Sequence, residues 1–385
     1  MNVRDLLFSL VNYTIKGEAI NKSEVEDSVS AEKLGALFKV SKGHDVAHLV
    51  GVALLENGIS LEGELEQSFF QEIEKAKLRY EMMRADCLEI YELFDSNNID
   101  YMPLKGAVVR KYYREPWMRT SCDIDILVRY DDLQRAKELL VSELKYRLDS
   151  AEEYHDISLY SPFGMHLELH YSICENNNKY DKILERVWEF AYSATQNGRK
   201  YALEEPYFLF HMIAHTAYHF ACGGCGLRSV LDIWILLVRA EFEREALFSL
   251  LKEGGLFEFF EKISELAEYW FGKRNEVSEL VLEMEKHILL GGTYGTSGRS
   301  VAFKSAKKGG KFKYFMSRIF MPYESLAILY PVIKKHKILT PFCQVARWFG
   351  VIFKSKRIAK EMKKIAAADK SQIEDISAML DKLGL

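Results

Sequence analysis

The segment that most constrains this chain is Ser121–Val128, where two carboxylates, Asp123 and Asp125, stand one residue apart in an apolar, β-prone run. Successive side chains of a strand point to opposite faces, so the two aspartates would share one face and the alternate apolar residues would face a core. Adjacent carboxylates repel and destabilise a sheet unless a positive group lies between them. A divalent metal ion often supplies that charge, so the segment predicts a Mg²⁺ platform. A solvated edge strand is the alternative for an isolated Asp-x-Asp pattern.

A third acid follows in the segment Met165–Tyr171, where His166, Glu168 and His170 alternate with leucines and would share one face. If this segment pairs beside the first, it places Glu168 close to Asp123 and Asp125. Three such carboxylates can hold two Mg²⁺ ions roughly 3.5–4 Å apart, which is the arrangement for in-line phosphoryl or nucleotidyl transfer. His170 has two interpretations, a partner that orients Glu168 or a packing residue.

Basic and glycine residues precede the acids. Lys105 and Gly106 stand at a predicted strand-to-helix junction, where glycine permits close backbone approach and free N–H groups favour phosphate. Arg119 lies four residues before Asp123. We therefore expect Lys105, Gly106 and Arg119 to grip a triphosphate.

The order of these motifs resembles the bacterial uncharacterised nucleotidyltransferase family of the DNA polymerase beta-like nucleotidyltransferase superfamily. The resemblance covers most of the chain from about Leu61 onward, and the Arg…Asp-x-Asp block is its most specific part. It is carried by the segments Ile99–Gly106, Met118–Val128, His166–His170, His215–His219 and Leu227–Asp232.

The resemblance implies transfer of a nucleoside monophosphate from an NTP, for which we expect ATP, to an acceptor such as a sugar, a metabolite or a protein. Asp123, Asp125 and Glu168 would hold two Mg²⁺ ions, and Glu168 would take the acceptor proton. Asparagine at either aspartate is expected to abolish turnover and to leave the fold intact or stabilised. Lys105-Gly106-Ala107 replaces the superfamily's usual Gly-Ser or Gly-Gly, which motivates one alternative, a non-catalytic nucleotide-binding regulator. A toxin–antitoxin component is another.

The residue pattern along the chain predicts an α+β fold, with a small mixed sheet flanked by N-terminal and C-terminal helical regions. The resemblance implies that this sheet is a polymerase beta-like nucleotidyltransferase core. The 385 residues, 48% of them hydrophobic, are sufficient for several domains. We place the domains at 1–95 (helical), 96–200 (catalytic core), 201–300 (helical, the other wall of the cleft) and 301–385 (basic, helical).

Periodicity and turn residues predict the elements of the core. A long helix over Leu61–Phe94 would end at Ser96-Asn97-Asn98, and Gly291–Gly310 would be a mobile loop. The expected strands are Ile99–Leu104, Cys122–Val128, Tyr154–Tyr160 and Met165–Ile173; the expected helices are Ala107–Tyr113, Asp131–Leu144, Pro206–Ala221 and Leu227–Arg239.

Two of the later helices carry further candidates. His215, His219, Cys222 and Cys225 have a spacing that would suit zinc, although histidines that line the cleft are the interpretation we favour. Arg228 is either a nucleotide or acceptor contact or the partner of Asp232 in an intrahelical ion pair.

Charge is distributed unevenly. Residues 303–364 hold 16 Lys/Arg and 2 acids, whereas the rest of the chain has 36 basic and 54 acidic residues, a net charge of −18. A solvated helix face is the simplest interpretation of this region. Its interleaved aromatics also suggest peripheral contact with an anionic membrane, with nucleic-acid binding ranked just behind the membrane.

Scattered cysteines and the lack of a signal peptide or of an apolar run of roughly 18 residues favour a cytoplasmic protein, with contact at the inner face of the membrane.

Overall fold

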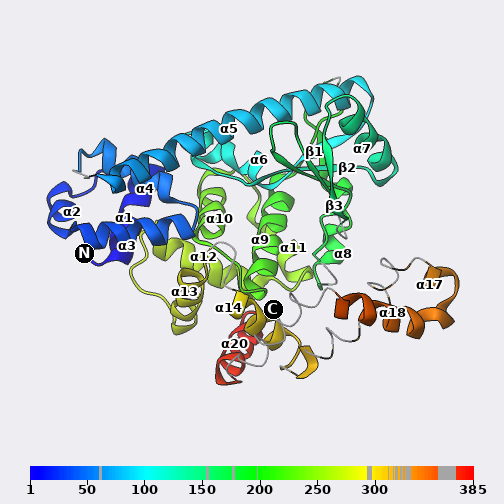
Figure 1. Ribbon diagram of the computed structural model, residues 1–385. Coiled ribbons are helices and arrows are strands. Elements are labelled where there is room, and N and C mark those ends of the chain that lie inside the picture. The colour runs from blue at the N-terminus through cyan, green and yellow to red at the C-terminus, as the bar shows by residue number, and fades with distance from the viewer. Residues whose placement is uncertain are drawn as a thin grey trace.

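The computed structural model has an α+β architecture in which a five-stranded mixed sheet is flanked by helices, as the sequence predicts (Figure 1). It describes residues 1–59, 63–152, 156–175, 178–196, 198–292, 297–310, 332–353 and 370–385, and 312–314, 316, 320, 323, 326 and 330 individually. The predicted domain boundaries stay a prediction.

The elements follow one another in chain order, with a helical N-terminal part, a core of strands and a long helical C-terminal part. The α-helices are α1 (Val3–Lys16), α2 (Lys22–Ser28), α3 (Ala31–Gly43), α4 (Ala47–Glu56), α5 (Glu64–Ser96), α6 (Lys105–Val109), α7 (Leu133–Ser142), α8 (Asp181–Leu184), α9 (Glu205–Ala221), α10 (Leu227–Arg239), α11 (Arg244–Glu253), α12 (Phe257–Phe271), α13 (Glu279–Gly291), α14 (Ser297–Lys307), α17 (Val332–Lys335), α18 (Thr340–Phe353) and α20 (Lys370–Lys382). The strands are β1 (Tyr101–Pro103), β2 (Asp123–Val128), β3 (Arg147–Glu152), β4 (Asp156–Tyr160), β5 (His166–His170), β6 (Ala191–Ser193) and β7 (Tyr201–Leu203).

The main sheet has the order β1-β2-β5-β4-β3, and β6 pairs with β7 separately. Its central pair, β2 and β5, is parallel, whereas the other pairs are antiparallel. In this pair Asp123 lies opposite His166, and Asp125 lies opposite Glu168. The parallel pairing therefore brings the two acidic segments to the same part of one sheet face.

The other face of the sheet is apolar. Ile124, Ile126, Leu167 and Leu169 are at most 1% exposed and form a core with residues of α5 and α7. Figure 1 shows α5 as the long cyan helix that crosses the sheet, with α7 at one end of it. Burial of each such side chain favours folding by about 1.5–3 kcal/mol, so this core fixes the acids on the opposite face.

Helices α9 and α10 lie on the opposite side of the sheet from α5 (Figure 1). They belong to a larger core that also contains residues of α1, α4, α12 and α20. Helix α9 is buried for most of its length, and α10 presents a strongly apolar face to the same core. The wall that faces the carboxylates is thus part of a well-packed helical body.

Most of the predicted elements are confirmed within a few residues, including the end of α5, where Asn98 adopts a positive φ of 52°. One prediction is wrong, because Gly291–Gly310 contains helix α14 in place of a loop. One element was missed, because no element was predicted for Arg147–Glu152, which forms the edge strand β3. Residues 61–62 of the predicted helix and 154–155 of the predicted strand lie outside the described residues.

Tertiary packing explains α14. Its side chains Ala302, Phe303 and Ala306 are at most 5% exposed and join the large core. This burial outweighs the weak helix propensity of a Gly- and Ser-rich stretch.

A small arm consists of α17, the short 3₁₀ turn Lys337–Leu339 and α18, drawn in orange in Figure 1. Its apolar side chains form a cluster of their own around Leu326, Ile333 and Cys343. In the part of the chain that the structure describes, no helix is both long and apolar enough to cross a bilayer.

Candidate active site

The predicted carboxylates converge. Asp123, His166 and Glu168 have ligand atoms within 4.8 Å of one another, and so do Asp125, Glu168 and His170. Glu168 belongs to both groups and therefore joins the two aspartates. The strand alternation and the parallel register of β2 and β5 produce this cluster without help from any loop.

Two basic side chains neutralise the cluster. Lys105 Nζ donates to Asp125 Oδ1 at 2.8 Å. His170 Nε2 lies 3.0 Å from Asp125 Oδ1 and 3.3 Å from Glu168 Oε2, so it bridges the two acids. His170 is thus a partner of the carboxylates, as one of its two interpretations anticipated.

The protonation states follow from these contacts. Burial alone would raise the pKa of Asp125, but Lys105 and His170 hold it well below its usual range. Burial would likewise lower the pKa of His170, but its bonds to Asp125 and Glu168 raise it to about 9. Asp123 has no such cationic hydrogen bond in the described structure, and burial followed by repulsion from Asp125 and Glu168 raises its pKa.

The junction before α6 is shaped by close packing. Lys105 adopts a positive φ of 41°, which is uncommon for a residue with a side chain. At Gly106, a Cβ atom would lie 2.2 Å from Ser121 Oγ and 2.9 Å from Arg119 Nη1. Only glycine lets this backbone reach the segment that leads into β2. Helix α6 has five residues, too few for a strong dipole at the predicted phosphate site.

Arg119 lies in the wall of the pocket, but its guanidinium is engaged by protein groups. It bonds both carboxylate oxygens of Asp232, with Nη2 2.7 Å from Oδ2, and it also bonds Ser121 Oγ. Asp232 additionally accepts a hydrogen bond from the Tyr113 hydroxyl at 2.7 Å. The expected grip of Arg119 on a triphosphate is therefore unsupported in this arrangement, since its role here is to join the sheet region to α10.

Arg228 has a similar cross-connection. It bonds Asp45 and the carbonyl of Thr120, while the Thr120 hydroxyl donates to Asp45 at 2.8 Å. The alternative intrahelical pair of Arg228 with Asp232 is therefore wrong, because each residue bonds a different partner. Asp45, from the N-terminal helical part, thus supports the segment before β2.

The cleft between the sheet and the helices is a pocket of about 500 Å³. The sheet side contributes the carboxylates, and α9, α10 and α14 contribute the opposite wall. Its lining is Lys105, Gly106, Arg119, Ser121, Cys122, Asp123, Asp125, Asp156, Glu168, Glu175, His215, Tyr218, His219, Cys222, Gly224, Arg228, Ser229 and Lys304. His215 and His219 therefore face the cleft, as the favoured interpretation stated.

The zinc alternative finds no support among the described residues, since His215, His219, Cys222 and Cys225 do not form a metal-binding group there. His215 Nδ1 instead lies 2.6 Å from Glu175 Oε1. Cys225 is buried, and burial raises the pKa of its thiol to about 12. None of the six cysteines forms a disulfide bond in the described structure.

Several residues of the pocket were not singled out from the sequence. Glu175 follows β5, and Asp156 begins β4 opposite His170. Asp156 is 3% exposed, and among the described residues no group donates to its Oδ1 atom. Burial raises the pKa of the Asp156 carboxyl. The position of Asp156 in a predicted strand was the one sequence feature that could have indicated its place in the pocket.

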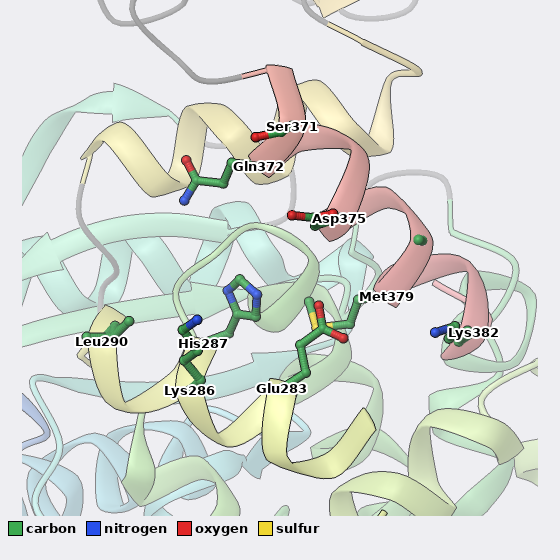
Figure 2. Close-up of a pocket in the computed structure, with 10 residues that line it drawn as sticks. Glu283, Lys286, His287, Leu290, Ser371, Gln372, Asp375, Met379 and Lys382 are labelled. Atoms are coloured by element: carbon green, nitrogen blue, oxygen red, sulfur yellow. The ribbon is translucent and has the colours of Figure 1, made fainter. Parts of the chain in front are cut away.

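A second cavity, of about 400 Å³, lies between α13 and α20 (Figure 2). Its lining mixes acids and bases with His287, and it shares no residue with the carboxylate pocket. The predicted carboxylates Asp123, Asp125 and Glu168 line the pocket at the sheet and not this second cavity.

A family model described as an uncharacterised nucleotidyltransferase matches residues 30–272. The chain belongs to this family. The match begins before Leu61, where the sequence resemblance was placed, and it ends before the basic C-terminal region. It therefore includes the N-terminal Asp45 together with the acids and α9. No curated protein matches the chain.

The opposite environments of the two aspartates predict opposite effects on stability in metal-free protein at neutral pH. The pKa of Asp123 is raised in the folded protein, so its ionisation opposes folding once the pH rises above the pKa of the unfolded state. Asp123→Asn removes this charge and should therefore raise the free energy of unfolding by roughly 1 kcal/mol. The pKa of Asp125 is lowered in the folded protein, so its charge stabilises the fold above the pKa of the unfolded state, and this stability is lost as the pH falls. Asp125→Asn should therefore lower the free energy of unfolding by about 1–3 kcal/mol. This corrects the expectation that both variants keep or gain stability.

Urea unfolding with a chelator present measures both effects. Asp131→Asn, an exposed acid just after β2, is the control and should change the unfolding free energy by less than about 0.5 kcal/mol. Equal stabilisation by both variants would contradict the charge assignment.

The buried pair of Arg119 and Asp232 predicts strong coupling. Their side chains are 8% and 2% exposed, so Asp232→Asn or Arg119→Met should each cost about 3–5 kcal/mol, and the double variant less than the sum. Arg186→Met, which breaks an exposed pair with Glu189, should cost about 0–1 kcal/mol. Additive losses in the double-mutant cycle would show that the pair does not join the two regions.

Proposed function

We propose that the protein is a Mg²⁺-dependent nucleotidyltransferase that moves the NMP group of an NTP, with ATP as the expected nucleotide, to an acceptor bound in the same pocket. The observation that carries this proposal is the register of β2 and β5, which gathers Asp123, Asp125 and Glu168 on the floor of a pocket of about 500 Å³. Membership of the nucleotidyltransferase family supports the general reaction.

The donor set fits magnesium. Carboxylate oxygens are the ligands that Mg²⁺ prefers, and Glu168 has ligand atoms close enough to share one ion with Asp123 and another with Asp125. Lys105 and His170 already supply positive charge to these acids, which indicates that the cluster requires cations. Bound there, two Mg²⁺ ions would neutralise charge on the phosphates and on the attacking and leaving oxygens.

The rest of the pocket suits a triphosphate and a second substrate. Lys105 and Arg228 supply positive charge near the acids, and Gly106 brings the backbone close to the cleft. His215 and His219 line the wall on the other side, which is left for the acceptor. The acceptor oxygen would attack the α-phosphorus while the bond to pyrophosphate breaks.

The test combines titration calorimetry of ATP with Mg²⁺ and a pyrophosphate-release assay over a panel of sugars, metabolites, proteins and RNA. Asp123→Asn, Asp125→Asn and Glu168→Gln should each lower the rate at least ~1,000-fold, because each removes a charged ligand needed in the transition state. Asp131→Asn should keep the full rate. Full activity in any of the three acidic variants would contradict the proposal.

The assay also separates the alternatives. Binding of ATP and Mg²⁺ without pyrophosphate release for any acceptor would favour a regulatory protein. Release only with RNA or one protein partner would favour the toxin–antitoxin alternative.

A further inference from the structure

Glu175 and His215 form a hydrogen-bonded pair on the wall opposite the carboxylates. His215 Nδ1 lies 2.6 Å from Glu175 Oε1, and both residues line the pocket. Glu175 is 7% exposed, and its backbone N–H donates to Asp181 at 2.9 Å, so its position is fixed. A buried carboxylate thus holds an imidazole that faces the cleft.

The environment keeps this imidazole neutral. Burial, followed by the charge of Lys105, lowers the pKa of His215 well below its ordinary value. A neutral ring carries one proton, and the short contact to Glu175 places that proton on Nδ1. Nε2 is therefore left with a lone pair that can accept a proton.

The ring also shares a pocket with the reacting groups. His215 lines the same cleft as Lys105, Asp125 and Glu168. Glu168 itself is less available as a base, since His170 already bonds it and metal binding would use its oxygens.

We propose that His215 is the catalytic base for the acceptor, positioned by Glu175, and that the acceptor reacts through a hydroxyl group. This inference rests on the proposed nucleotidyl transfer. The acceptor O–H proton moves to His215 Nε2, the oxygen forms a bond to the α-phosphorus, and the bond from that phosphorus to pyrophosphate breaks. A hydroxyl needs such a base, whereas a phosphate or carboxylate acceptor is already ionised at neutral pH.

The first test compares binding with turnover, using ATP, Mg²⁺ and the best hydroxyl acceptor of the panel, or water. His215→Gln should lower kcat by about 10²–10⁴-fold and change the Kd for ATP with Mg²⁺ by less than about twofold. Glu175→Gln should lower kcat at least ~10-fold, because its amide can bond the ring in the wrong tautomer. His287→Gln, at a histidine of α13 that lies outside this pocket, is the control and should keep the full kcat.

The second test is chemical rescue. Imidazole added to His215→Ala should restore part of the lost turnover, whereas it should not restore Asp123→Asn. Full kcat in His215→Gln, a proportional loss of ATP binding, or no rescue by imidazole would overturn the role of His215. Absence of pyrophosphate release by the unaltered protein would instead overturn the proposed function.

A second proposal comes independently from the arm formed by α17 and α18. Large apolar side chains stand exposed along it at helical spacing: Ile338 is 83% exposed, Phe342 71% and Val345 41%. Ile333 and Cys343, in contrast, are buried in the arm's own core. Exposed apolar stripes of this kind mark interaction surfaces.

The positive charge of this part of the sequence favours an anionic partner. Between residues 325 and 360 the sequence has eight Lys/Arg and no Asp/Glu, and Lys335 and Lys337 are exposed beside Ile338. We propose that this face docks on an anionic lipid bilayer, with the apolar residues in the interface and the lysines at the headgroups. Two of the three stripe residues are aliphatic, which suits lipid better than the stacked bases of a nucleic acid.

Cosedimentation of the full chain tests this with vesicles of phosphatidylcholine alone or mixed with phosphatidylserine. Binding should require phosphatidylserine and should fall at ~1 M salt relative to ~0.1 M salt. Lys335→Glu with Lys337→Glu, or Ile338→Asp with Phe342→Asp, should weaken it roughly tenfold or more. Phe70→Asp, at a phenylalanine of α5 that is 53% exposed, is the matched control and should bind unchanged.

Three results would overturn the membrane proposal. They are equal binding to neutral vesicles, no vesicle binding at all, and displacement from vesicles by RNA at equal charge concentration, which would assign the arm to nucleic acid.

Discussion

The site depends on the repulsion between carboxylates that the parallel pairing of β2 and β5 forces together. The apolar core beneath the sheet fixes Asp125 opposite Glu168, so the acids cannot separate to lower their electrostatic energy. Lys105 and His170 offset this repulsion when no metal is bound. Both cations bond Asp125 Oδ1, so an ion that used this oxygen would compete with them. The sheet thus holds a cluster of negative charge that a bound cation can neutralise.

Polar bonds connect the sheet region to the helical wall. Arg119 reaches Asp232 in α10, and Arg228 of α10 reaches back to Asp45 and Thr120. These contacts join three separated parts of the sequence at the segment just before β2. They fix the distance between the acids and the opposite wall. Substitutions of these residues would therefore change the shape of the pocket even though the residues need not contact a substrate.

The features that depend on the alternation of side chains along a strand could be predicted from the sequence. The shared face of Asp123 and Asp125, and the position of Glu168 on a second strand, follow from the two-residue period of a strand. The partners of Arg119 and Arg228 could not be predicted, because Asp232 and Asp45 lie more than 100 residues away and leave no periodic signal. Strand β3 lacks alternating apolar residues, and α14 owes its helix to burial of Phe303.

The parallel pairing of β2 with β5 also has a consequence for how the protein is made. The crossover between them contains α7, β3 and β4, and the far wall comes from α9, α10 and α14, so the pocket needs residues from Lys105 to Lys304 at the same time. Such non-local closure is slow compared with helix formation. During synthesis on the ribosome the acidic strand β2 emerges well before that wall, so a growing chain has no complete site until α14 has left the exit tunnel.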